Sequence, residues 1–300
     1  MKKLLICALF LALTTSISYA QRERDFSKTV IQTTRVNESV YMLEGEGGNI
    51  ALSIGADGVL MIDDQFAELH KKIMTAINEL STAPIKFLIN THWHGDHTGG
   101  NELMNATGTH IIAHDNVRQR LSTKQIRKML ERISEARDKE ALPVLTFKES
   151  IKLHFNDETI DVMHFQPGHT DGDSVIFFQK ANVVHMGDLF FNGRYPFIDL
   201  DSGGDVDGYI QSVQTVLDKI SEDTQIIPGH GPLGTKKDLQ VFYNMLQSSR
   251  QLIQKAVAEK KSLEEIQQLE LPEAFQEGWG SGFVNKERWF STLYAFYAQN

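Results

Sequence analysis

The sequence has 300 residues but only one cysteine, Cys7. That cysteine lies in an N-terminal segment which we expect to be removed, so the mature chain has no thiol. A chain without thiols forms no disulfide bond and has no thiolate to act as a nucleophile or metal ligand. Any metal chemistry must therefore come from histidine and carboxylate side chains.

Long apolar runs are also scarce. The N-terminal sequence MKKLLICALFLALTTSISYA has two lysines, then an apolar run from Leu4 to Leu13, then small and polar residues up to Ala20. This order is typical of a secretory signal peptide, and the run is too short to span a bilayer as a helix. We predict a signal peptide over residues 1–20 and a secreted or periplasmic mature protein without a membrane anchor. A retained single anchor is the alternative.

Positive charge is the third shortage. The chain has 39 acidic and 30 basic residues, a formal net charge of −9. This balance argues against nucleic acid as a partner, because binding to phosphates requires a basic surface. We expect a small-molecule substrate, and the composition leaves the oligomeric state open.

The apolar pattern predicts a β-rich part followed by helices, twice over. For the first part, we expect one helix at 68–80 and strands at 39–45, 49–55, 58–64, 84–91 and 109–114. Residues 115–141 are mostly charged, with apolar residues at helical spacing, which predicts an amphipathic helical segment that links the two parts or caps a site.

The second part repeats this order. We expect strands at 146–155, 158–165, 173–179, 181–188 and 224–229, and helices at 207–220, 235–259 and 285–297. Two sheets with helices outside them are the economical packing for such a chain. The predicted fold is an α/β four-layer αβ/βα sandwich, with residues 21–300 forming one domain that ends in a helical extension.

The segment THWHGDHTGGN, residues 91–101, follows an apolar strand and carries His92, His94, Asp96 and His97. Loops just past strand ends are where rigid scaffolds present functional groups. His92 and His94 are two residues apart, so in extended backbone their side chains point to the same side. Gly95 would let the chain turn and bring Asp96 and His97 back to that side. Imidazole nitrogens and carboxylate oxygens are zinc ligands, so the segment predicts a metal site.

Three later residues share one setting, in which a strand and a glycine come directly before a potential ligand. They are His169 in PGHTDGDS, Asp188 in HMGDLFF and His230 in IIPGHGP. We expect these strand-end loops to meet at one edge of the sandwich.

Together with the acidic strand end LMIDD, this ordered set resembles the metallo-β-lactamase superfamily over roughly residues 38–235. The resemblance implies two zinc ions. One would be bound by His92, His94 and His169, the other by Asp96, His97 and His230, with Asp188 bridging them.

The resemblance also implies a chemistry. A hydroxide between the ions would attack a carbonyl carbon, since zinc lowers the pKa of bound water to about 7 and the two ions stabilise the oxyanion. Asp96 could orient the hydroxide and pass a proton to the leaving group. Asp63, or in its place Asp64, would lie outside the ligands and orient the ligand loop.

The loop after Asp188, LFFNGRYPFIDLDSGGD, could form a wall of the substrate pocket. Within it, Asn192 would face the pocket, Tyr195 could donate a hydrogen bond to an oxyanion, and Arg194 could bind a carboxylate. The alternative is a loop that its own aromatic residues hold in place.

The favoured function is a secreted dinuclear zinc-dependent hydrolase that opens a lactone, ester, thioester or cyclic amide. In the family that this chain resembles, the cysteine-ligand β-lactamases have cysteine where this chain has Asp188, whereas lactonases and thioester hydrolases have aspartate. A β-lactamase-type activity stays an alternative. From another class, the alternatives are a structural zinc site or a metal-binding or di-iron redox protein; His94, where iron-binding members often have glutamate, favours zinc.

Overall fold

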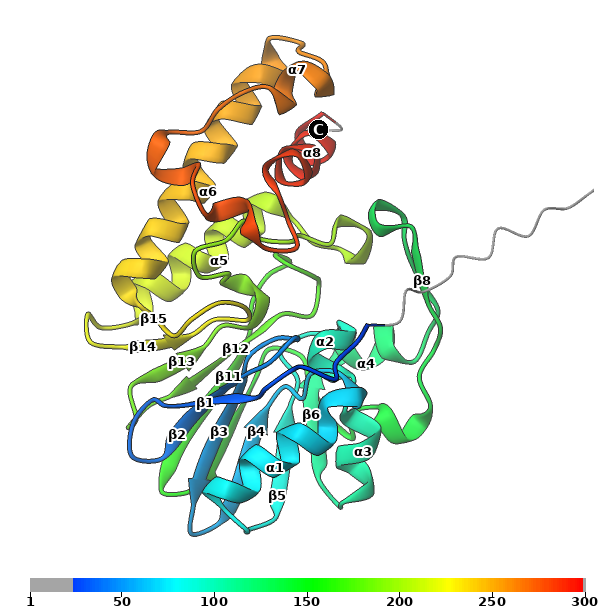
Figure 1. The fold of residues 1–300 in the computed structure, drawn as a ribbon, viewed down its shortest axis with the longest axis vertical. Helices are drawn as coiled ribbons and strands as arrows, with labels where there is room; N and C mark the ends of the chain where they lie inside the picture. The colour runs from blue at the N-terminus through cyan, green and yellow to red at the C-terminus, as the bar shows by residue number, and fades with distance from the viewer. Residues whose placement is uncertain (1–23, 299–300) are drawn as a thin grey trace, which may run out of the picture.

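Two β-sheets packed face to face, with helices on their outer sides, make up the structure, a computed structural model that describes residues 24–298 (Figure 1). This is the predicted αβ/βα arrangement. The predicted signal peptide, residues 1–20, lies outside the described residues. Within residues 24–298, no helix has the length and apolar character needed to cross a membrane.

The first sheet has seven strands in the order β1-β2-β3-β4-β5-β6-β9. Their bounds are β1 Gln32–Arg35, β2 Val40–Glu44, β3 Ile50–Gly55, β4 Gly58–Ile62, β5 Ile85–Ile89, β6 His110–His114 and β9 Leu145–Phe147. Strands β4, β5, β6 and β9 are parallel to one another. Helices α1 (His70–Leu80) and α3 (Asn101–Ala106) cover the outer face, where Ile73 and Met104 pack against strand residues such as Leu52. Burial on both faces explains the nearly continuous apolar sequence of β4.

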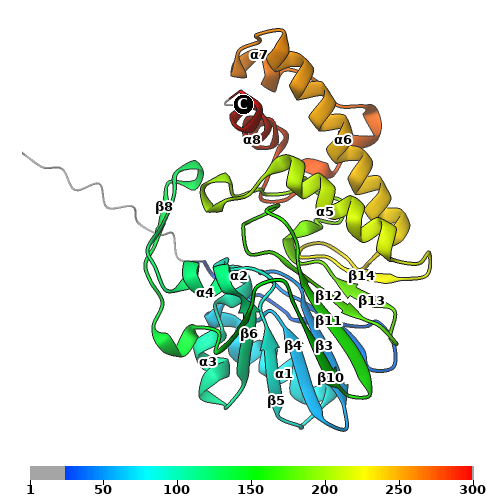
Figure 2. The same ribbon diagram turned by 180° about the vertical axis from the view of Figure 1, so that it is seen from behind.

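The second sheet has six strands in the order β10-β11-β12-β13-β14-β15. Their bounds are β10 Ser150–Phe155, β11 Glu158–His164, β12 Ser174–Phe178, β13 Val183–His185, β14 Gln225–Ile227 and β15 Gly234–Thr235. Helices α5 (Val206–Lys219) and α6 (Lys236–Ala258) cover its outer side, and α7 (Leu263–Gln267) and α8 (Lys286–Tyr297) pack beside α6 beyond the end of the sheet (Figure 2).

The inner faces of the sheets share one apolar core. Leu60 and Ile89 of the first sheet belong to the same buried cluster as Ile176 and Ile227 of the second. The strand ends of both sheets are therefore fixed relative to each other, which is what a site built from both sheets requires.

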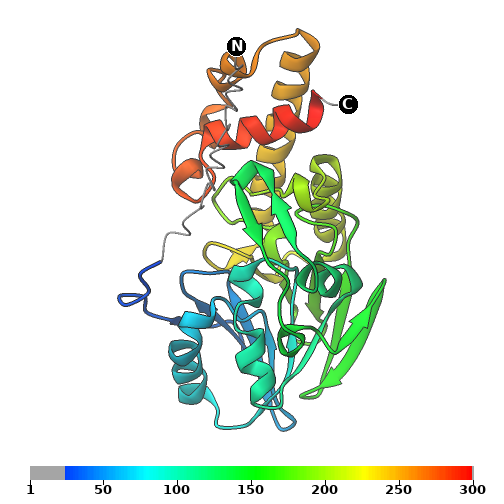
Figure 3. The same ribbon diagram turned by 90° about the vertical axis from the view of Figure 1, so that its right-hand side faces the viewer.

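The prediction of a helical segment over 115–141 is wrong beyond its first seven residues. Helix α4 (Asp115–Leu121) is followed by a hairpin of β7 (Gln125–Arg127) and β8 (Arg132–Ser134), with a 3₁₀ turn, Lys128–Leu130, at its tip. Ile126 and Ile133, whose spacing we interpreted as helical, face each other across the hairpin. Figure 3 shows this hairpin standing beside the C-terminal helices.

The predicted single strand over 146–155 is two strands in different sheets. Strand β9 ends at Phe147 in the first sheet, and β10 begins at Ser150 in the second. The apolar residues continue across the break because both strands contribute to the same inner core.

Candidate metal centre

The seven predicted ligands converge at one edge of the sandwich, from loops that follow four strands. His92, His94, Asp96 and His97 come after β5 and lie in the short helix α2 (Gly95–Thr98) or just before it. His169, Asp188 and His230 follow β11, β13 and β14 of the other sheet. The site therefore lies where the ends of the two sheets meet.

Four buried side chains, His92, His94, His169 and Asp188, form the first group. His94 Nδ1 lies 3.2 Å from His92 Nε2 and 2.9 Å from His169 Nε2. Asp188 Oδ2 lies 3.3 Å from His169 Nε2 and 3.8 Å from His92 Nε2. Ligand atoms about 2.0–2.1 Å from a tetrahedral zinc ion are separated by about 3.3 Å, so these distances fit one ion.

The second group contains Asp96, His97 and His230. Asp96 Oδ2 lies 3.5 Å from His230 Nε2 and 3.9 Å from His97 Nε2. The other oxygen of Asp188, Oδ1, lies 3.1 Å from His97 Nε2 and 3.5 Å from His230 Nε2. Asp188 thus presents one oxygen to each group, the placement of a bridging ligand.

Two buried atoms beside the second group, His97 Nε2 and Asp188 Oδ1, lie 3.1 Å apart, and neither forms a hydrogen bond of good geometry with any described residue. Leaving such atoms unpaired is costly in a protein interior. A bound cation would satisfy both, so the donor set fits a metal ion.

Three histidines are held through the ring nitrogen that faces away from the metal position. His94 Nε2 donates to Asp199 Oδ2 at 2.8 Å, His169 Nδ1 to the Phe197 carbonyl at 2.6 Å, and His97 Nδ1 to Asp63 Oδ2 at 2.7 Å. Partners of this kind fix the ring orientation and leave the other nitrogen's lone pair for a metal.

The two candidate orienting carboxylates, Asp63 and Asp64, have different partners. Asp63 accepts hydrogen bonds from the Thr91 amide and hydroxyl, both at 2.8 Å, as well as from His97. Asp64 accepts from the Gly100 amide instead. Asp63 also has a φ of 59°, an uncommon conformation for a residue with a side chain. Both carboxylates therefore contact the ligand loop, and Asp63 is the one that bonds directly to the side chain of a predicted ligand, His97.

Asp199 is a functional contact that the sequence did not reveal. It is 2% exposed and also accepts a hydrogen bond from the Ser202 hydroxyl. It lies in the loop FIDLDSGGD, where Asp199, Asp201 and Asp205 are equally plausible from sequence. Only the fold shows which of them reaches His94.

Burial and charge set opposite protonation preferences in the two groups. Burial lowers the pKa of His94 to about 4, so this ring is neutral and ready to bind a metal. Burial also lowers the pKa of His230, but Asp188 and Asp96 outweigh it and raise that pKa to about 9. A proton on His230 and a metal ion compete for the same nitrogen.

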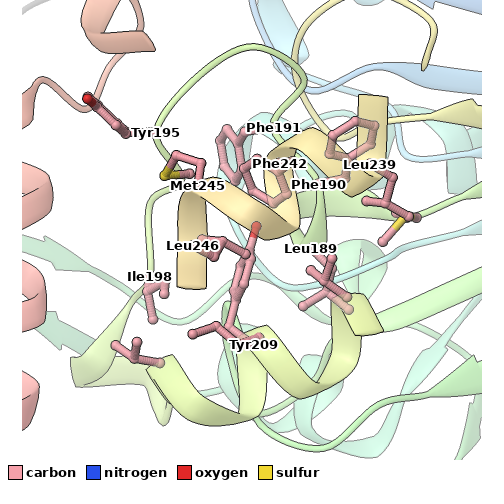
Figure 4. Close-up of a cluster of buried hydrophobic side chains, with 14 of the residues drawn as sticks. Leu189, Phe190, Phe191, Tyr195, Ile198, Tyr209, Leu239, Phe242, Met245 and Leu246 are labelled. Atoms are coloured by element: carbon pink, nitrogen blue, oxygen red, sulfur yellow. The ribbon is translucent and has the colours of Figure 1, made fainter. Parts of the chain in front are cut away.

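The backbone around Asp188 is closely packed. The Tyr209 hydroxyl of α5 donates to the Asp188 carbonyl at 2.8 Å, and Figure 4 shows this tyrosine projecting toward Phe190 and Phe242. A Cβ atom at Gly229 would lie 2.1 Å from Asp188 Oδ1, so position 229 has no space for a side chain. Tyr209 therefore holds the backbone of Asp188, and the close approach of Gly229 confines its carboxylate.

Asn49 joins the two sheets beside the site. Its side-chain Nδ2 donates to the carbonyls of Pro228 and Gly231, at 3.0 and 2.8 Å, in the loop that carries His230. Its own carbonyl accepts from His185 Nε2 of β13 at 3.0 Å. A residue of the turn between β2 and β3 thus positions two ligand-bearing segments of the second sheet.

The three predicted pocket residues have different positions. Arg194 and Tyr195 line the pocket that opens over His94, Asp96, Asp188 and His230. The Tyr195 hydroxyl, however, donates to the Phe275 carbonyl at 2.6 Å, so it is not placed to donate to an oxyanion. In Figure 4 its oxygen points away from the neighbouring hydrophobic side chains. Asn192 donates to the Pro232 carbonyl and does not line the pocket.

Comparison with known proteins places the chain in a family. The profile of the metallo-beta-lactamase superfamily matches residues 54–230, and the chain belongs to this superfamily. The predicted resemblance is confirmed.

Individual relatives are more distant. The chain is 29% identical over 196 residues to a probable metallo-hydrolase, YqgX of Bacillus subtilis, with 63% of this chain and 89% of the relative covered. It is 27% identical to the hydroxyacylglutathione hydrolase GloC of Haemophilus influenzae, with 58% and 82% covered. Its fold is similar to that of a metallo-beta-lactamase from Pontibacter korlensis, with a TM-score of 0.60, 18% identity, and 72% and 99% covered.

Proposed function

We propose that this protein is a dinuclear zinc-dependent hydrolase that cleaves a carbonyl compound, namely a lactone, ester, thioester or cyclic amide. The observation that carries the proposal is the placement of Asp188, which offers Oδ2 to one ligand group and Oδ1 to the other. A structural zinc site needs about four ligands, whereas seven converge here.

The chain's residues divide into two ion sites. His92, His94 and His169 would hold one zinc ion, Asp96, His97 and His230 the second, and Asp188 both. When bound, two zinc ions supply a hydroxide nucleophile at neutral pH and polarise the carbonyl oxygen. The pocket over the site gives a substrate access to His94, Asp96, Asp188 and His230.

Asp96 is the ligand best placed to move a proton. Its side chain is 31% exposed, against 5% for Asp188 and 19% for His230, and it lines the pocket. The carboxylate oxygen that does not bind the ion would accept the proton of the attacking water and deliver it to the leaving group. Asp188 is more deeply buried, so its role would be to hold the ions rather than to exchange protons with the substrate.

The test is a metal analysis joined to a substrate panel. We expect two zinc ions per chain by plasma emission spectrometry. We also expect turnover of at least one member of a panel of lactones, aryl esters, thioesters and the β-lactam nitrocefin. Turnover confined to nitrocefin would favour the β-lactamase alternative, and bound iron with oxygen-dependent turnover would favour the redox alternative. One tightly held metal ion with no turnover of any substrate would falsify the proposal.

The role of Asp96 has its own test. Asp96→Asn keeps the shape of the side chain but removes its basic oxygen, so we expect kcat to fall by about 100-fold or more with zinc still bound, as for loss of a general base. Unchanged turnover with full zinc content would contradict the assignment.

We further propose that the enzyme acts outside the cytoplasm as a secreted or periplasmic protein, on the basis of the pattern in residues 1–20. Expression of the full chain followed by N-terminal sequencing of the extracytoplasmic fraction should give Gln21 as the first residue. An uncleaved chain in the membrane fraction would support the anchor alternative.

A further inference from the structure

The pocket over the metal centre is rich in arginine although the chain as a whole is acidic. Arg24, Arg127, Arg132 and Arg194 line it, in a protein with a net charge of −9. Within residues 24–298, the arginines that form ion pairs are Arg120 and Arg250, neither of which lines this pocket. None of the four pocket arginines therefore forms an ion pair with a described residue, although Asp96 and Asp188 line the same pocket at the metal centre.

Two of these arginines face each other on the hairpin. Arg127 of β7 is paired in register with Arg132 of β8, and both line the pocket. Like charges at directly opposed positions destabilise a hairpin. The neighbouring pair, Ile126 and Ile133, points to the other face, where these side chains are 58% and 53% exposed. The hairpin therefore turns its charged face to the site and its apolar face outward.

The Arg127 guanidinium has unused hydrogen-bonding capacity. Its Nη2 donates to the Ser134 hydroxyl at 3.2 Å, and the group lies 5.1 Å from the centroid of the Trp93 ring. Its Nε is buried and has no partner among the described residues. Stacking on Trp93, which stands between His92 and His94, fixes this guanidinium beside the metal centre.

The hairpin is attached at its base and at its tip. At the base, Arg120 forms two hydrogen bonds of 2.7 Å with Asp171 and one of 2.9 Å with Gln125. At the tip, the Met129 amide donates to Asp201 Oδ2 at 3.0 Å, two residues from Asp199. The arginine pair is thus held over the site.

We propose that the substrate carries an anionic group of carboxylate type, bound by Arg127 and Arg132, with an apolar portion against Phe197 and Phe283. This inference rests on the proposed hydrolase function and names its substrate class. Guanidinium groups match carboxylate oxygens in geometry and charge, and an anion between the two arginines removes their repulsion. Phe197 and Phe283 line the same pocket as the arginines.

The experiment compares two esters with the same leaving group and acyl length. Mono-4-nitrophenyl adipate ends in a carboxylate, and 4-nitrophenyl hexanoate ends in a methyl group. With the zinc-loaded protein we expect the higher kcat/KM for the adipate ester. In R127Q/R132Q we expect the loss of kcat/KM for the adipate ester to exceed the loss for the hexanoate ester by about tenfold or more. In R132Q alone the difference between the two losses should be smaller.

Lys128→Gln is the matched control. Lys128 lies at the tip of the same hairpin but outside the pocket, so this variant removes one charge without changing the lining. We expect the ratio of the two kcat/KM values to stay at its wild-type value. R132K should retain part of the preference, because it keeps the charge but loses the two-pronged contact.

The two proposals fail in different ways. Equal efficiency with both esters, unchanged in R127Q/R132Q, overturns the anion site but leaves the hydrolase standing. If neither ester is cleaved, calorimetric binding of free adipate to the zinc-loaded proteins decides. Binding of adipate about tenfold weaker in R127Q/R132Q but unchanged in Lys128→Gln supports the anion site, and equal binding in all variants overturns it.

Discussion

The metal-binding edge and the β7–β8 hairpin lie on either side of one pocket but differ in how their polar groups are satisfied. At the edge, His94, His97 and His169 each have a second partner that fixes the ring. On the hairpin, Arg127 and Arg132 are opposed without a contacting carboxylate. The edge is organised in advance to bind a metal ion, whereas the hairpin presents positive charge that a bound anion would neutralise.

Removing the bridge should have the largest effect at the organised edge. Asp188→Asn keeps the side chain's size but lacks the second anionic oxygen shared between the groups. We expect kcat/KM to fall by about 10³-fold or more and zinc content to drop below two ions per chain, since several kcal/mol of charge stabilisation are lost. Steady-state kinetics and metal analysis measure both, and retention of two ions with wild-type turnover would contradict the bridging role.

The second-largest effect is expected from a substitution that displaces the imidazole ring of His97. A Cβ atom at Gly48 would lie 2.0 Å from His97 Cε1, so Gly48→Ala must displace this ring. We expect about 100-fold weaker binding of one zinc ion, the upper range for disturbing a ligand's orientation. A competition assay with a chromophoric chelator measures the affinity.

Gly95→Ala is the control for this variant. Although Gly95 lies inside the ligand motif, a Cβ atom there would meet only Arg137 Nη2, at 3.6 Å, and the residue begins α2 without a positive φ. Zinc affinity should stay near the wild-type value. Equal losses in both variants would show that close packing at Gly48 is not the cause.

Weakening a single orienting contact should have a smaller effect. Asp199→Asn keeps an oxygen that can accept from His94 Nε2 but loses the negative charge. We expect zinc affinity to fall about tenfold, at the low end for such contacts. Asp201→Asn, two residues along, bonds the hairpin tip rather than a ligand and should leave zinc affinity unchanged.

The outer face of the hairpin should be the least sensitive. Replacing both Ile126 and Ile133 by threonine keeps residues that favour strands at two exposed positions. We expect the free energy of unfolding to change by less than about 0.5 kcal/mol per site. Chemical denaturation measures it, and a loss of 2 kcal/mol or more would mean that this face is packed.

The same contrast explains what the sequence could predict. The strands are predictable because their buried residues form apolar runs, as in β12, or alternate with partly exposed ones, as in β11. The convergence of the seven ligands follows from their positions just after strand ends. Residues 124–135 lack a buried face, so their spacing carried no reliable information on conformation. The spacing of Ile126 and Ile133 suggested a helix. In the structure each is the middle residue of a three-residue strand, and the two are paired across the hairpin.

Contacts made between distant segments were beyond the sequence for another reason. Asp199 was one of three acids in its loop, and the Tyr195 hydroxyl was assigned to an oxyanion because nothing in the sequence placed Phe275 beside it. Both contacts depend on how the C-terminal part folds over the second sheet. Local pattern identifies a ligand, whereas its neighbours are determined by tertiary packing.

The bond network of Asn49 has a consequence for how this protein matures. Because Asn49, in the turn between β2 and β3, holds the His230 loop and β13, the ligands from the two sheets meet only after the halves of the chain have docked. Metal uptake is then coupled to the last stage of folding rather than to the first. A chain whose halves had not joined would have no complete site to fill, so zinc would be acquired only by molecules that are already correctly assembled.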